Sequence, residues 1–120
     1  CDYLQRIHQM LMPGGQLVTI TPNWYVRPSD VTANVYPPRT EAAGLHLKEY
    51  TLREVSRLLR QNGFRRVETP LVVVPSQIVL FGRGLIGPKR WFEPALEWLP
   101  FPLTRLFCRG FALSTTVATK

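Results

Sequence analysis

Hydrophobic positions at the start of the chain repeat with helical spacing. They are Tyr3, Leu4, Ile7, Met10 and Leu11, with polar residues between them on the opposite face. The pattern predicts an amphipathic helix that ends before Pro13, because proline cannot continue a helix. Pro13 and Gly14 suit the central positions of a type II turn, whose second residue adopts a positive φ. Phosphate-binding glycines follow a strand, whereas Gly14 and Gly15 precede one, so we expect them only to turn the chain.

A strand and a long loop follow this turn. Residues 16–21 are rich in β-branched side chains, which predicts a short strand that Pro22 and Asn23 terminate. Residues 22–50 contain four prolines and little periodicity, so we expect an ordered loop with a helical turn near residues 29–35. Loops of this length within a compact domain are commonly functional.

The clearest local signal is the stretch YTLREVSRLLRQNGF, which predicts a helix with a cap at each end. Thr51 suits the N-cap, and Glu54, three residues later, completes a capping box. The predicted buried stripe is Leu52, Val55, Leu58 and Leu59, and the predicted solvated face is Arg53, Arg57 and Arg60. Gly63 suits the left-handed position that ends such a helix, and Phe64 is then placed to contact its last turn.

The second half of the chain alternates between strand-like and apolar, proline-containing stretches. Residues 65–74 alternate weakly and then become wholly apolar, as expected for a strand buried on both faces, and residues 77–81 are a strand-like piece that extends this strand. Residues 88–109 mix bulky apolar side chains with several prolines, which predicts two short helices rather than one long helix. Residues 111–120 predict a strand that runs to the last residue.

One glycine motif imitates a dinucleotide fingerprint. Gly82, Gly84 and Gly87 have the G-x-G-x-x-G spacing and follow a strand-like run. Pro88 stands where the helix of that motif begins, and Glu97 is the last acidic residue, so the acid expected about twenty positions later is missing. We therefore interpret these glycines as a hinge.

Charge and cysteine content narrow the function classes only a little. The formal net charge is +7, which would permit contact with nucleic acid or anionic lipid. Charge alone does not indicate a nucleic-acid partner, and we expect none. Cys1 and Cys108 are far apart and indicate neither a disulfide framework nor a metal site, so a reducing, cytoplasmic location is expected.

The order of these elements resembles the C-terminal half of a class I S-adenosylmethionine-dependent methyltransferase. The matching stretches are MLMPGGQLVTITPN, HLKEYTLREVSRLLRQNGF and STTVATK. The resemblance implies an α/β fold with a partial Rossmann-like methyltransferase sheet and flanking helices in one domain, residues 1–120. Residues 16–21 would be the fifth strand, 65–74 the sixth, and 113–120 the seventh, antiparallel between the other two. Residues 75–110 would be a helical insertion before that last strand.

The same resemblance implies a fragment of a methyltransferase that acts on a small-molecule or lipid acceptor, with S-adenosylmethionine as the cofactor of the whole protein. The family's glycine-rich cofactor loop would precede Cys1, so we expect no cofactor-binding residue in this chain. Asn23, Trp24 and Tyr25 fall at the carboxyl end of the fifth strand, where the family faces the acceptor. His46 could approach the same edge as a base or a hydrogen-bond donor.

Each of these residues also has a structural interpretation. Trp24 and Tyr25 would cover the sheet edge, and His46 would fix its loop by bonding to the backbone. No catalytic side chain is required, since methyl transfer often needs only in-line placement of the acceptor.

The insertion departs from the short hairpin that is ordinary in the family. Its apolar and basic residues fit three interpretations: a lid over an apolar acceptor, an interfacial segment in which residues 88–109 rest on anionic lipid, or an extra layer of core. The rival function is a non-catalytic basic interaction module, peripherally associated with a membrane, in which the half-sheet is only a scaffold.

Overall fold

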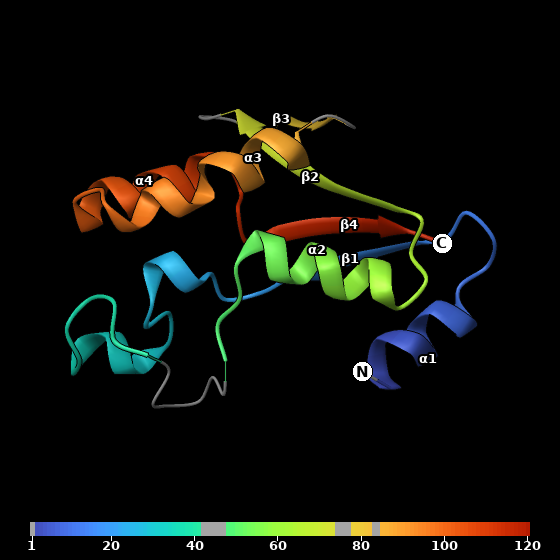
Figure 1. Cartoon of the computed structure of the whole chain (residues 1–120), viewed down its shortest axis with the longest axis horizontal. Helices are drawn as coiled ribbons and strands as arrows, with labels where there is room; N and C mark the ends of the chain where they lie inside the picture. Colours follow the sequence, from blue (N-terminus) through green and yellow to red (C-terminus); the bar gives the residue numbers. More distant parts are fainter. Residues whose placement is uncertain (1, 42–47, 74–77, 83–84) are drawn as a thin grey trace.

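The computed structural model describes residues 2–41, 48–73, 78–82 and 85–120 (Figure 1). The helices are α1 (Asp2–Met10), α2 (Leu52–Gln61), α3 (Ile86–Phe92) and α4 (Phe101–Gly110), and the strands are β1 (Gln16–Ile20), β2 (Arg66–Val73), β3 (Ile78–Gly82) and β4 (Thr115–Thr119). The described chain also has short 3-10 helices, η1 (Trp24–Val26), η2 (Val31–Asn34) and η3 (Glu93–Glu97). The described chain is thus a small α/β domain, and the helical turn expected near residues 29–35 is η2.

The strands form one sheet in the order β1-β4-β2-β3. β4 lies between β1 and β2 and is antiparallel to both, so β1 and β2 run parallel to each other. This is the position and direction that the resemblance implies for the last strand. The strand begins at Thr115, later than residue 113 where we expected it, because residues 111–114 form a turn after α4.

The prediction that residues 77–81 extend the preceding strand is wrong. β3 pairs antiparallel with β2, with Val73 opposite Ile78, so the chain reverses between the two strands. Pro75 and Ser76 lie between them in the sequence, and residues of these types favour a reversal over a continuous strand.

The turn before β1 and both caps of α2 match the sequence prediction. Gly14 has a φ of +79°, and the amide of Gly15 donates to the Met12 carbonyl at 2.8 Å, as in a type II turn. Thr51 and Glu54 exchange the two hydrogen bonds of a capping box, at 3.1 and 3.0 Å. Hydrogen bonds between residues close in sequence therefore determine both this turn and the start of α2.

The C-terminal end of α2 is a Schellman motif. Gly63 has a φ of +97°, and the amides of Gly63 and Phe64 donate to carbonyls of the last turn at 3.2 and 3.3 Å. The cap returns the chain onto the sheet, so Phe64 is buried in the core together with Leu59.

α2 lies against one face of the sheet (Figure 1), where it packs on β2 and β4, and the main core forms between them. Its buried members include Leu52, Val55, Leu59, Val67 and Ala118. Arg53, Arg57 and Arg60 are exposed, so the predicted solvated face of α2 is confirmed. Leu58, which we placed in the buried stripe, is only half-buried because it borders an open groove beside β1.

The segment before β4 adds a second layer to this core. Ile86, Leu96 and Cys108, from α3, η3 and α4, belong to the same buried cluster as the α2 side chains. Of the three interpretations of the insertion, the extra layer of core is therefore confirmed for its inner face. Its outer face keeps Trp91 and Trp98 exposed.

We predict that Gly63→Ala lowers the free energy of unfolding by about 1 kcal/mol or more, because alanine is strained at positive φ. The new Cβ would also lie 3.0 Å from Cε1 of His8. Gly87→Ala in α3 is the matched control, since nothing lies within 4 Å of its Cβ and alanine favours a helix by up to about 1 kcal/mol. Urea unfolding midpoints measure both changes, and equal losses would contradict the left-handed cap.

Candidate functional site

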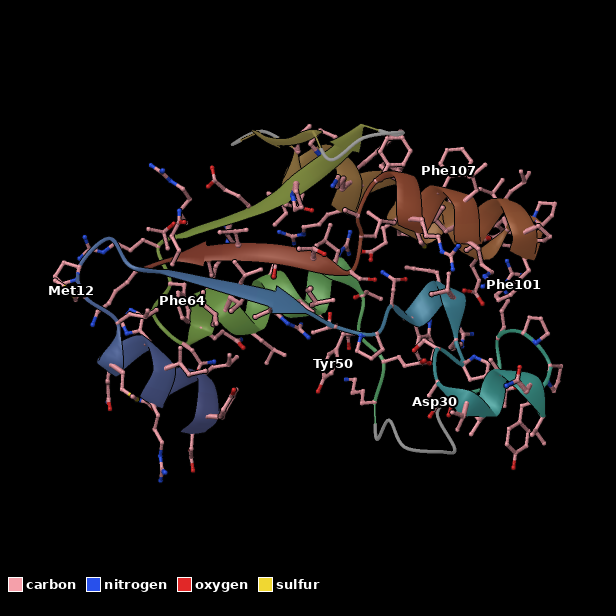
Figure 2. The ribbon with its side chains drawn as sticks, turned by 180° about the vertical axis from the view of Figure 1, so that it is seen from behind. Met12, Asp30, Tyr50, Phe64, Phe101 and Phe107 are labelled. Atoms are coloured by element: carbon pink, nitrogen blue, oxygen red, sulfur yellow. The ribbon has the colours of Figure 1, made fainter. Side chains whose placement is uncertain are left out.

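A cavity of about 660 Å³ opens between α4, the loop after β1 and the start of β4. Val26 and Ala33 contribute from η1 and η2, and Ser114 and Thr115 contribute from the other side. η1 and η2 follow β1 directly, so the cavity lies at the carboxyl end of that strand. Figure 2 shows Phe101 on the side of α4 that faces the loop carrying Asp30, and Phe107 on the other side.

Two arginines of α4 give the cavity its charge. Arg105 and Arg109 both line it, and residues four apart in a helix lie on the same face. Within the described part of the chain, neither guanidinium has a hydrogen-bond or ion-pair partner. Asp30 is the carboxylate of the wall, and it accepts hydrogen bonds from the amide and hydroxyl of Thr32, the amide at 2.9 Å.

The remaining wall combines hydroxyl groups with apolar surface. Ser29, Tyr36 and Ser114 supply hydroxyls, while Pro28 and Phe101 supply apolar contact. Cys108 also lines the cavity, but burial raises the pKa of its thiol to about 12, so it is not a thiolate nucleophile at neutral pH.

The outer edge of β1 is open along the strand. The amide of Thr21 donates to the Ser114 carbonyl, and the amide of Lys120 donates to the Gly15 carbonyl. These bonds show that the backbone amides and carbonyls of the odd-numbered residues of β1 point toward β4. In an antiparallel ladder the alternate amides point the other way, so those of Gln16, Val18 and Ile20 point to the open edge. No described strand pairs with them.

The open edge borders an apolar groove of about 430 Å³. Its walls are Tyr3, Leu4 and Ile7 of α1, the length of β1, and Leu58 of α2. Val18 and Ile20 are 59% and 77% exposed. Beyond the strand the edge is closed, because Tyr50 exchanges hydrogen bonds with the backbone of Pro22 and Trp24 at 2.9 and 3.1 Å.

Protein families, curated proteins and solved structures were compared with this chain. None matches it. Within the described ranges, no helix has both the length and the apolarity needed to cross a membrane. Nor does that part of the chain bring three His, Cys, Asp or Glu side chains together as metal ligands.

Of the four predicted acceptor-binding residues, Asn23, Trp24 and Tyr25 lie beside the cavity without lining it, and His46 lies outside the described residues. Asn23 is 1% exposed; its side chain accepts from the Tyr25 amide at 3.0 Å and donates to the Leu113 carbonyl at 3.4 Å. It therefore ties the end of β1 to the segment that enters β4. Acceptor contact by these residues stays a prediction.

Tyr25 and Trp24 have structural partners. Tyr25 is buried in the core, and burial, with Glu93 and Glu97 nearby, raises its pKa to about 12. The Trp24 ring is half-buried beneath the Arg27 guanidinium, 3.9 Å from its centre. Both aromatic side chains thus have partners within the fold, and the interpretation that they cover the sheet edge stays a prediction.

Two arginines, the buried Arg27 and the half-buried Arg39, fix the loop wall of the cavity to the insertion. Arg27 pairs with Glu97 at 3.1 Å and donates to the carbonyls of Trp24 and Arg39 at 2.8 and 3.1 Å. Arg39 in turn donates to the Leu96 carbonyl at 3.2 Å. The contacts to Glu97 and Leu96 join residues 70 and 57 positions apart in the sequence, so no local pattern predicts them.

Glu93 fixes the insertion to α2. Its carboxylate is 1% exposed and accepts hydrogen bonds from the amides of Leu52 and Arg53, at 2.6 and 3.2 Å. Burial raises the pKa of Glu93, and these two hydrogen bonds oppose the rise by favouring the ionised form. Together with Thr51, this carboxylate satisfies the free amides at the start of the helix.

Lys89 joins α3 to the sheet and to the end of α4. Its ammonium group donates to Thr69 Oγ1 at 2.9 Å and to the carbonyls of Pro70, at 2.6 Å, and Phe111. The side chain is 2% exposed and has no carboxylate partner among the described residues. Burial lowers the pKa of Lys89 to about 8.

We predict that Lys89→Met lowers the free energy of unfolding by about 1–3 kcal/mol at neutral pH, because buried oxygens lose their donor. The folded-state pKa is depressed from 10.5 to about 8, so between these values the unfolded state binds more protons. The stability of the wild type should therefore rise with pH across that window relative to the variant. Paired urea titrations test this, and a gap that narrows with rising pH would contradict it.

Proposed function

We propose that this chain is the C-terminal part of an S-adenosylmethionine-dependent methyltransferase that acts on a small-molecule or lipid acceptor. The observation that carries the proposal is the sheet, in which β1 and β2 are parallel and β4 lies antiparallel between them. That arrangement agrees with the order of fifth, seventh and sixth strands that the sequence resemblance implies. The partial Rossmann-like sheet is part of the same proposal.

The open edge of β1 supports the proposal that another strand pairs with β1 in the whole protein. Free edge amides beside exposed apolar side chains favour pairing with another strand. Val18 and Ile20 are exposed beside an apolar groove that runs along this edge. In the proposal, the cofactor-binding half of the domain supplies a parallel strand there and covers the groove, so the residues that hold S-adenosylmethionine lie outside this chain.

The cavity beside α4 is the proposed acceptor site. It lies at the carboxyl end of β1, which is where ligands bind in open α/β sheets. Its volume of about 660 Å³ falls within the range of small-molecule sites. Catalysis then consists of holding the acceptor in line with the sulfonium carbon, and no side chain of this chain needs to form a covalent intermediate.

The test begins with the coding sequence upstream of the Cys1 codon. We expect an open frame that encodes a strand, a glycine-rich loop and an acid about twenty residues later. The protein from the full frame should bind S-adenosylmethionine in equilibrium dialysis, and the 120-residue chain alone should not. A full-frame protein that folds but does not bind the cofactor would overturn the proposal.

A second candidate function, peripheral membrane binding, is favoured by the outer face of the insertion. Trp91 and Trp98 are 84% and 90% exposed, and Leu103 and Leu106 are exposed on the adjoining helix. Tryptophan and leucine in a basic segment partition into the membrane interface. This observation fits an interaction module as well as a methyltransferase with a lipid acceptor.

We predict that Trp91→Ala with Trp98→Ala reduces co-sedimentation with phosphatidylglycerol vesicles by about tenfold, because each tryptophan contributes on the order of 1 kcal/mol or more of apolar burial. Met10→Ala with Met12→Ala is the control, since these side chains are similarly exposed but lie outside the insertion. Unchanged sedimentation of the tryptophan variant would eliminate this function.

A further inference from the structure

We propose that the cavity beside α4 binds an organic anion, a carboxylate or phosphate carried on an apolar body. Arg105 and Arg109 both line the cavity and lie one turn apart on α4. Paired guanidiniums bind carboxylate and phosphate through two parallel hydrogen bonds each, which lysines cannot reproduce. The inference does not rest on the proposed function, since such binding is measured without methyl transfer.

Arg105 and Arg109 differ from the two arginines of the facing loop. Arg27 and Arg39 make hydrogen bonds that fix the loop to the insertion. Arg105 and Arg109 have no such partner in the described ranges, although they face the same loop across the cavity. Their donors are therefore available to a ligand.

The rest of the wall suits an amphiphilic ligand. Ser114 and Thr115 line the cavity with hydroxyl side chains, while Val26, Pro28 and Phe101 offer apolar surface. The Ser29 hydroxyl is already committed, because it donates to the Glu49 carboxylate at 2.5 Å. Asp30 opposes an anion, but it already accepts hydrogen bonds from Thr32, and the wall has two cationic residues against this one carboxylate. The residues that line the cavity therefore carry a net positive charge at neutral pH, although the buried Glu49 carboxylate lies behind Ser29.

Octyl phosphate and octanoate are suitable probes, because each joins an anionic group to an apolar chain. In calorimetry with the 120-residue chain, we expect both probes to bind at least tenfold more tightly than octanol. Arg105→Gln with Arg109→Gln should weaken binding of both anions at least tenfold. Arg57→Gln with Arg60→Gln removes the same charge from the exposed face of α2 and should change binding less than twofold.

A second measurement needs no variant to fold. Phenylglyoxal modifies accessible arginines, and mass spectrometry of the wild-type chain identifies the modified positions. Octyl phosphate should protect Arg105 and Arg109 and leave Arg57 and Arg60 reactive. Protection by dispersed octyl phosphate would identify a free amphiphile as the ligand. Protection only by phosphatidylglycerol vesicles would identify a lipid headgroup. Both results agree with a cavity that binds an anion carried on an apolar body.

Three results would overturn the inference. The first is equal weakening by both glutamine pairs, which would mean that general charge attracts the anion. The second is octanol binding as tightly as the anions, which would mean that the cavity recognises no charge. The third is unchanged reactivity of Arg105 and Arg109 with every anionic probe.

Discussion

The carboxylate of Glu93 lies at the start of α2, where it accepts hydrogen bonds from two backbone amides. This contact holds the insertion against the helix that covers the sheet. The pair between buried Arg27 and partly exposed Glu97 and the buried Lys89 ammonium add two more polar attachments, one to the loop after β1 and one to β2. Because α4 follows this anchored segment, its position beside the loop, and hence the cavity, depends on them.

Two surfaces of β1 lack a partner in the described part of the chain, one along its open edge and one at its carboxyl end. Along the strand, an unpaired backbone edge adjoins an apolar groove. At the carboxyl end, a cavity carries two guanidiniums without partners among the described residues. The first surface fits a neighbouring strand and the second fits a ligand, so both features agree with a domain whose cofactor half and acceptor lie outside this chain.

Local features could be predicted from the sequence, and long-range polar contacts could not. Thr51, Glu54 and Gly63 determine the caps of α2 through neighbours within a few residues, and the structure has both caps. Glu93 contacts residues about forty positions away, so no periodicity predicts it. The sequence correctly placed Asn23 and Tyr25 at the carboxyl end of β1, but it did not indicate that both side chains are buried.

The same limit explains why the cavity arginines were not predicted. The sequence shows that Arg105 and Arg109 are four residues apart and so share a helix face. It does not show which part of the chain lies opposite that face. The loop that faces α4 comes from residues 26–38, far away in the sequence, and the contacts of Arg27 with Glu97 and of Arg39 with Leu96 that fix it are equally remote.

Amide hydrogen exchange along β1 tests the central claim, that this strand is an interior strand of a larger sheet. In the chain alone, the amides of Val18 and Ile20 should exchange fast while those of Leu17 and Thr19, which face β4, are protected. In the protein from the full coding frame, all four should be protected. Val18 and Ile20 amides that exchange at the same rate in both proteins would contradict the account.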